Sequence, residues 1–397
     1  MRRSTTVFAT LATLVSLAGC TAAAPPAPSP ASTRGDAHGE VADAQEVPEV
    51  PLALLAVDAA GGVGMVDLLD GASTSLGTLG SAPDALHSDG RYAFVTTENG
   101  VEVIDSGRWT WDHVDHFHYY RATPRLVGTV TGAGAATVST GPLSTTGHSG
   151  VFFAGSGEAV LLDNRALAAG EIVEAFRIRV GDAGALVAPV GDGALVARGD
   201  RLVLHDGDGS ATDAEIDCTD PSGTITTRVG VVVGCEDRVV LATGTGPVPR
   251  LDAIPYPERA AAERAVSFDG RKGRPTVAGV AGDDGFWLLD TRERQFRLVE
   301  TPVPLQRVTA VDDAEEHVVA LDVDGRVRVY TAGAEFAVTD HLVDDPSRAV
   351  LTVDEHRAYL SVPEADAVLE IDFADHARIA RTVAIGGDVA LFAEVGR

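Results

Sequence analysis

The hydrophobic and polar positions of this chain repeat as a hairpin, in which two apolar runs flank a tight polar turn and the second run often ends in Asp. We count eight copies, with turns near Gly61, Asn99, Gly157, Asp200, Glu236, Asp284, Asp324 and Ala365. Their spacing is mostly close to roughly forty residues, which leaves room for two further strands in each unit. Helical periodicity is indicated only for Pro257 to Ala265. The pattern therefore predicts an all-β protein made of repeated units.

A single hairpin cannot bury both of its faces, but four-stranded units stacked radially around an axis cover one another. We therefore predict a β-propeller of about eight blades, with seven as the alternative if one hairpin is miscounted. The last segment, Val389 to Val395, is expected to pair into the first blade and close the ring. A parallel β-helix is a poorer fit because its repeats are much shorter.

The first 20 residues have the layout of a secretory signal peptide. Arg2 and Arg3 form a charged start, Val7 to Ala18 form a short apolar stretch, and small residues precede Cys20. The sequence Leu17-Ala18-Gly19-Cys20 resembles a bacterial lipobox, which implies cleavage before Cys20 and a diacylglyceryl group on its sulfur. An ordinary signal peptide followed by a chance cysteine is the alternative. With the lipid, the protein is expected on the outer face of the cell membrane.

The remaining chain divides into a tether and one large domain. Residues 21–50 are rich in Ala, Pro and Ser and then acidic, so they are predicted to be disordered. Residues 51–397 carry the repeats and are predicted to form the propeller. A net charge of −27 makes nucleic acid and anionic lipid poor partners, and favours cations or basic surfaces.

The chain has three cysteines, and assigning Cys20 to the lipid leaves Cys218 and Cys235. In an oxidising compartment two remaining cysteines indicate a disulfide. Two thiolate metal ligands are the alternative.

One interval between hairpin turns, from Asn99 to Gly157, is longer than the others. The excess lies between the third strand of the second blade, ending at Asp105, and a fourth strand predicted at Pro124 to Val130. Long loops in compact domains are more often functional or disordered than idle, and the aromatic content of this one argues against disorder.

Histidines are concentrated in this insertion. His116 and His118 are two residues apart, so on an extended chain they point to the same side and can ligate one ion. His113 requires a turn to join them. Asp112 and Asp115 are candidate ligands or candidate acceptors that orient the imidazoles.

Propeller topology indicates further ligands, because loops between first and second strands and between third and fourth strands emerge on one face. His87, placed in the first of these loops of the same blade, and His148, in the equivalent loop of the next blade, fall on the face of the insertion. The alternative is an aromatic plug in which the histidines serve only as hydrogen-bond partners. The histidines elsewhere are expected to be surface or turn residues: His205, His317, His341, His356 and His376.

Several of these segments resemble the AztD family of periplasmic zinc metallochaperones, which serve an ABC-type zinc importer. The resemblance depends on Asp112 to Tyr120 followed by Pro124, with support from Gly147 to Gly150, Gly234 to Asp237 and Ala393 to Arg397. It implies a β-propeller that binds zinc through histidines and passes it to a solute-binding protein. By the resemblance, the zinc residues are His113, His116, His118 and His148. The chain departs from the family near Ala183-Gly184 and between its two cysteines, where further histidines are expected and absent.

The chain shows no phosphate-binding glycine loop, nucleophile elbow or zincin helix motif, so we expect no catalysed reaction. The favoured function is a monomeric zinc metallochaperone. A cell-surface scaffold or adhesion propeller that binds a protein through its acidic face, without metal, is the alternative. A propeller hydrolase such as a lactonase ranks last, because no acidic cluster has a spacing that demands a metal in the channel.

Overall fold

A computed structural model describes residues 41–397, except residues 113–115, 143, 182–183, 245, 247, 258–261 and 387–388. The predicted signal peptide, Cys20 and the tether up to residue 40 lie outside the described residues, as do His113 and Asp115. Within the described ranges, no helix is long and apolar enough to cross a membrane.

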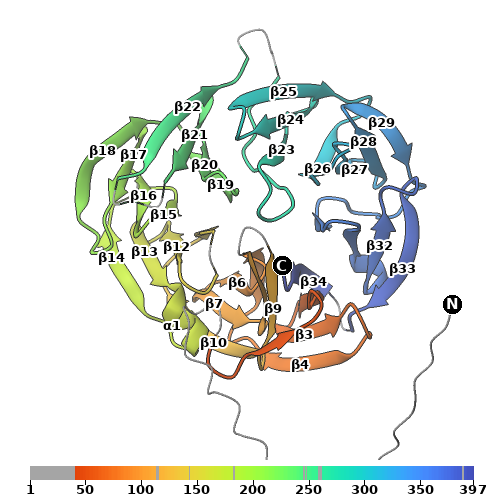
Figure 1. Cartoon of the computed structure of the whole chain (residues 1–397), viewed down its shortest axis with the longest axis horizontal. Coiled ribbons are helices and arrows are strands. Elements are labelled where there is room, and N and C mark those ends of the chain that lie inside the picture. Colours follow the sequence, from red (N-terminus) through yellow and green to blue (C-terminus); the bar gives the residue numbers. More distant parts are fainter. Residues whose placement is uncertain are drawn as a thin grey trace, which may run out of the picture. The chain divides into compact units, whose positions relative to one another are not determined.

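The described chain from residue 41 onward forms an eight-bladed β-propeller (Figure 1). Seven blades are four-stranded sheets, and the sixth is a three-stranded sheet whose inner position is taken by an isolated bridge between Asp269 and Ala278. All-β architecture and the propeller are thus as predicted.

From the innermost strand to the outermost, blade 1 contains β34 (Val389–Val395), β2 (Ala53–Asp58), β3 (Gly62–Asp67) and β4 (Ser73–Thr78), and blade 2 contains β5 (Pro83–Ser88), β6 (Tyr92–Thr97), β7 (Gly100–Asp105) and β10 (Arg125–Thr131). Blade 3 contains β11 (Ala136–Thr140), β12 (His148–Phe153), β13 (Glu158–Asp163) and β14 (Glu174–Arg179). Blade 4 contains β15 (Val187–Val190), β16 (Gly193–Ala197), β17 (Arg201–His205) and β18 (Ala211–Asp217). In the same order, blade 5 contains β19 (Ser222–Thr226), β20 (Val231–Gly234), β21 (Arg238–Thr243) and β22 (Arg250–Pro255), and blade 6 contains β23 (Thr276–Val280), β24 (Gly285–Asp290) and β25 (Gln295–Glu300). Blade 7 contains β26 (Leu305–Ala310), β27 (Val318–Asp322), β28 (Val327–Thr331) and β29 (Ala334–Val338). Blade 8 contains β30 (Leu351–Val353), β31 (Ala358–Val362), β32 (Ala367–Asp372) and β33 (Arg378–Ala384).

A ninth sheet, with strand order β1-β9-β8, is formed by β1 (Gln45–Val47), β8 (Arg108–Asp112) and β9 (Phe117–Arg121). Strands β8 and β9 are the predicted insertion between β7 and β10. Strand β1 belongs to the segment predicted to be a disordered tether, so the end of that segment is ordered against the insertion.

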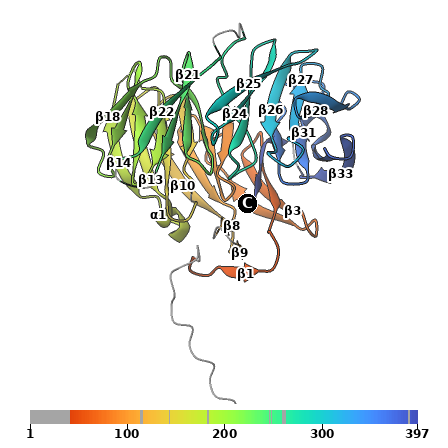
Figure 2. The same ribbon diagram turned by 45° about the horizontal axis from the view of Figure 1, so that its top comes forward.

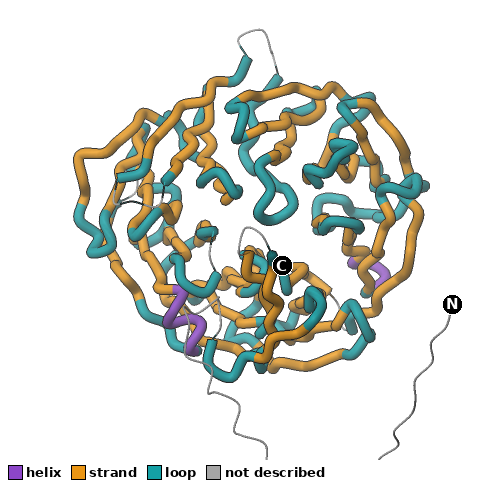
Figure 3. The backbone as a smooth tube through the Cα atoms, viewed as in Figure 1, coloured by secondary structure: helices purple, strands orange, loops and turns teal. Residues whose placement is uncertain are grey.

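The described helical elements are α1 (Asn164–Ala169) and the 3₁₀ turn η1 (Pro363–Ala365), drawn in purple in Figure 3. Helix α1 begins where the Asp163 side chain accepts the backbone N–H of Arg165, and it ends at Gly170 with φ 86°. The sequence did not predict it, because a six-residue helix is too short for a periodic pattern. The predicted helix between Pro257 and Ala265 includes residues outside the described ones, and its last four residues are not helical.

The core follows the blade count. Buried apolar residues form eight clusters, and each cluster joins one pair of neighbouring blades; in one of them Phe94 and Val103 of blade 2 pack with Val151 and Val160 of blade 3. Middle strands such as β6 are buried at every position because both faces of the sheet are covered. The outer strand β18 alternates between exposed and half-buried residues. Eight interfaces exclude the seven-blade alternative.

The ring closes through its last strand, as predicted. Strand β34 pairs antiparallel with β2, with Val395 opposite Ala53 and Ala393 opposite Leu55. The first blade therefore combines the beginning and the end of the domain, beside each other in Figure 1.

Cys218 and Cys235 form a disulfide, with their Cα atoms 5.1 Å apart. Both residues are buried in the cluster that joins blades 4 and 5, so the bond links these two blades. The alternative of two thiolate metal ligands is excluded.

Candidate metal centre

The described part of the histidine-rich insertion is a pair of strands on one rim of the ring, where Figure 2 shows β8 and β9 next to β1. Trp109 lies opposite Tyr120 in the register, and their rings stack with centroids 5.3 Å apart. Trp111 lies opposite His118. Because side chains alternate along a strand, Tyr120, His118 and His116 share one face of the hairpin.

A buried ion pair holds the base of this hairpin. The Arg91 guanidinium donates to both carboxylate oxygens of Asp105, at 3.0 and 2.9 Å, and both side chains are fully buried. The same guanidinium lies 3.9 Å from the centroid of the Trp109 ring, a cation–π contact. Gly107, at φ 65°, begins the insertion, and a Cβ there would lie 2.3 Å from the carbonyl oxygen of Ala122. These contacts therefore fix the position of the backbone where the insertion leaves blade 2.

Asp67 of blade 1 holds the hairpin from the side. Its carboxylate accepts from Arg108 on β8 and from Arg121 on β9, each at 2.9 Å. Burial favours the neutral acid, but the backbone N–H of Leu69 and the two guanidinium groups outweigh it and lower the pKa of Asp67. One carboxylate thus fixes both strands.

Strand β8 reaches away from blade 2 through two contacts. Asp112, predicted as a metal ligand or orienting group, forms an ion pair with Arg228 in the turn between β19 and β20 of blade 5. On the other side, the Thr110 hydroxyl donates to the carbonyl of Gly396 at 2.7 Å. The hairpin therefore lies over the rim that carries the turns between first and second strands.

The structure brings His116 and His118 together, as the two-residue spacing predicts. Their Nε2 atoms are 2.9 Å apart, and their ring centroids are 4.7 Å apart. On its other side, His118 Nδ1 lies 2.7 Å from Oε1 of Glu46 on β1. An ionised carboxylate only accepts hydrogen bonds, so Nδ1 of His118 donates to Glu46, and in the neutral imidazole the Nε2 lone pair then faces His116.

This arrangement suits a metal ion. In tetrahedral zinc sites, bond lengths of about 2.0–2.1 Å place two nitrogen ligands about 3.3 Å apart, so the His116 and His118 nitrogens need to separate by only a few tenths of an ångström. A carboxylate on the remote nitrogen of a ligating imidazole, as Glu46 is on His118, is a recurrent feature of such sites. Sequence reasoning missed Glu46 because it lies far from the histidines along the chain, in a segment expected to be disordered.

His148 and His87, the other predicted histidines that the structure describes, do not belong to a compact group of ligands. His148 begins β12 opposite Asp163, half-buried, and burial lowers its pKa more than Asp163 and Asp192 raise it. His87 lies within β5 rather than in the following loop, and it is exposed. Protein atoms around its ring still remove part of the water, and this desolvation lowers the pKa of His87. Among the described residues, neither belongs to a group of three or more ligating side chains with donor atoms within 4.8 Å of one another.

One such group occurs elsewhere in the described chain and was not predicted. It consists of Asp313, Glu315 and His317 in the loop between β26 and β27. His317 is 5% exposed, and its Nδ1 lies 2.6 Å from Asp313 Oδ2. The expectation that His205 and His317 are surface residues was wrong, since both are buried. His205 ends β17, where its Nδ1 meets the carbonyl of Gly209, and His317 lies in a loop, immediately before β27. His341, His356 and His376 are exposed, as expected.

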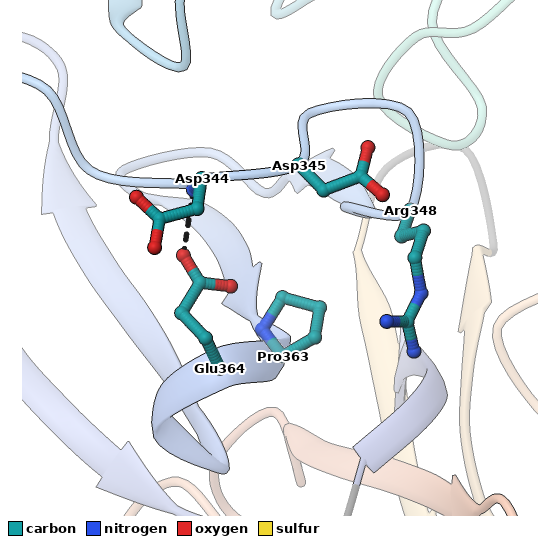
Figure 4. Close-up of a pocket in the computed structure, with 5 residues that line it drawn as sticks. All are labelled: Asp344, Asp345, Arg348, Pro363 and Glu364. Carbon is teal, nitrogen blue, oxygen red and sulfur yellow. Dashed lines mark hydrogen bonds between the residues drawn. The ribbon is translucent and has the colours of Figure 1, made fainter.

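A pocket of about 280 Å³ lies on the opposite rim, between the β29–β30 loop and η1. Figure 4 shows its lining, in which Glu364 Oε1 accepts the backbone N–H of Asp344 at 2.7 Å and Arg348 lies on the far side of Pro363. None of the predicted ligands lines it.

The chain is similar in fold to AztD from Citrobacter koseri. Two solved AztD structures, one of them of the apo protein, match with TM-scores of 0.74 and 0.73 at 19% and 18% identity, covering 87% of this chain and 98% of AztD. Hsv2 from Kluyveromyces lactis matches with a TM-score of 0.50 at 8% identity, over 76% of this chain and 98% of Hsv2. No family model and no curated protein sequence matches. At these identities the likeness shows a shared propeller fold.

Proposed function

We propose that this protein is an extracytoplasmic zinc-binding protein, a metallochaperone that hands Zn²⁺ to the solute-binding protein of an ABC importer. The observation that carries the proposal is the His116–His118 pair with Glu46 behind it. The AztD-like fold and the family resemblance of the insertion support the same function. No catalysed reaction is part of the proposal.

The surroundings of the pair suit a cargo ion rather than a permanently held one. His116 is exposed and the His118 side chain is 20% exposed, so a partner can reach both. Two imidazoles leave coordination positions open. His113, His148, His87 and Asp115 are the further ligands that we propose, whereas Asp112 is engaged by Arg228.

Replacing both His116 and His118 by alanine is expected to weaken zinc binding by at least about 100-fold, because two of the four tetrahedral ligands are lost. Affinity and stoichiometry are to be measured by competition with a chromophoric chelator, on protein lacking residues 1–20. His356→Ala, which removes an exposed histidine from a turn of blade 8, is the matched control and should bind like the parent. Unchanged stoichiometry and affinity in the double variant would exclude this site.

The competing function is a scaffold or adhesion propeller that binds a basic protein surface. The net charge of −27 favours it, and it predicts no tight zinc site and a partner that is lost at high salt. Stoichiometric zinc binding by the wild-type protein therefore decides between the two.

The proposed location depends on Cys20, which is outside the described residues. The Cys218–Cys235 disulfide fits an oxidising compartment. We expect Cys20→Ser to move the protein from the membrane fraction to the soluble fraction of cells, because the lipid is the proposed anchor. Fractionation with immunoblotting measures this, and membrane retention of the variant would contradict lipidation.

A further inference from the structure

Strand β1 comes from the segment that leads into the propeller, yet it forms the edge of the sheet that carries the histidine pair. It pairs antiparallel with β9, with Glu46 opposite Tyr120 and Val47 opposite Tyr119. Side chains at a position and its diagonal neighbour share a face of a sheet. Glu46 is therefore on the same face as Tyr120 and His118, and its carboxylate reaches His118 Nδ1 across this diagonal.

Little buried surface holds β1 in place. It is three residues long, Gln45 and Glu46 are exposed, and only Val47 is half-buried. A short edge strand with little apolar burial opens locally at low free-energy cost. The Glu46–His118 hydrogen bond at 2.7 Å adds a side-chain contact to the backbone pairing of β1 with β9.

The chemistry of this bond ties the strand to the metal. A carboxylate on Nδ1 favours the tautomer of His118 in which Nε2 is unprotonated and can ligate a metal, and it raises the basicity of that nitrogen. A bound cation in turn makes the Nδ1 proton more acidic and strengthens its bond to Glu46. Thermodynamic coupling is reciprocal, so the factor by which docking of β1 raises the zinc affinity is also the factor by which bound zinc raises the docking equilibrium constant of β1.

We infer that Glu46 is a positioning residue of the zinc site, and that zinc binding at His116 and His118 and docking of strand β1 stabilise each other. The inference depends on the proposed function. It makes the segment before the propeller part of the site: displacement of β1 loosens the ion, and binding of the ion holds β1 on β9.

Three variants of the full chain test the positioning role. Glu46→Gln is expected to weaken zinc binding by about 10- to 100-fold, the usual effect of losing such an orienting group. Glu46→Asp should recover part of the affinity, because it keeps a carboxylate. Glu49→Gln, an exposed neighbour beyond the strand, should bind like the wild type. Wild-type affinity in Glu46→Gln, with loss in the double histidine variant, would overturn the inference and leave the zinc site standing.

Two further measurements separate the inference from the proposed function. Zinc should slow hydrogen exchange at residues 45–47 in the wild type but not in Glu46→Gln, and equal exchange with and without bound zinc would refute the coupling. In metal-free protein, ¹⁵N NMR should find the His118 proton on Nδ1 in the wild type and a mixture of tautomers in Glu46→Gln. If the wild type bound no zinc, the proposed function would fail, while the tautomer would still report whether Glu46 orients His118.

Discussion

Replacement of Asp105 by alanine is expected to lower the free energy of unfolding by about 3–5 kcal/mol, because it leaves the Arg91 guanidinium buried without its counter-charge. Both side chains of the pair have 0% exposure, and Arg125 also donates to Asp105, at 3.3 Å. The same variant should weaken zinc binding, since the hairpin starts beside this carboxylate. Urea denaturation and zinc titration measure the two effects.

An exposed ion pair of the same length is the matched control. Arg297 and Glu316 lie 2.9 Å apart with side chains 46% and 60% exposed, and Glu316→Ala should cost less than about 1 kcal/mol. Replacing Arg91 and Asp105 together by Met and Leu should be less damaging than Asp105→Ala, because no buried charge remains. Equal losses for Asp105→Ala and Glu316→Ala would show that burial of the pair does not matter.

Glu394→Gln is expected to make the stability of the protein less dependent on pH. Glu394 lies on the closing strand β34, 2% exposed. Its burial, together with the Asp354 and Glu370 carboxylates of blade 8, raises its pKa from 4.5 to about 8, although Arg397 Nη2 lies 2.9 Å away and opposes the shift. Tyr359, whose hydroxyl donates to Asp354 at 3.0 Å, completes the surroundings.

A raised pKa in the folded state means that folding favours the protonated acid. The resulting stabilisation is complete below about pH 4.5 and is lost as the pH rises through about 8. Between pH 5 and pH 9 the wild type should therefore lose about 4 kcal/mol more unfolding free energy than Glu394→Gln. Urea denaturation at both pH values measures this. Glu300→Gln, at an exposed position of β25, should follow the wild type, and parallel curves for Glu394→Gln would disprove the raised pKa.

The fold was predictable because it depends on local patterns of apolar runs and tight turns. Each predicted turn, from Gly61 to Ala365, joins the second and third strands of a blade, since tight turns and apolar runs are fixed by neighbouring residues. The closing strand was predictable because the last segment is apolar and β-rich with no other partner. Helix α1 was not, because one side-chain cap and a few small residues define it.

The candidate site was predictable only in part. The His116–His118 contact follows from the two-residue period of a strand. Glu46 could not be predicted, because its approach depends on strand pairing between segments distant in the chain. The buried Asp313–His317 contact was missed because a single histidine in an acidic loop gives no sign of its burial. His148 and His87 remain proposals, since the topology that places them on one rim does not set distances.

The closing strand also sets the order of assembly. Strand β2 begins the first blade, but its inner neighbour β34 is made last, so seven blades can form while the first still has an open edge. Closing so long a loop is entropically costly and slow, and until then β2 offers unpaired backbone groups to other chains. The ring can therefore close only after the residues up to Val395 have been synthesised. A chain truncated shortly before this residue would form an almost complete ring in which the edge of β2 is unpaired. We expect this form to be the most prone to aggregation.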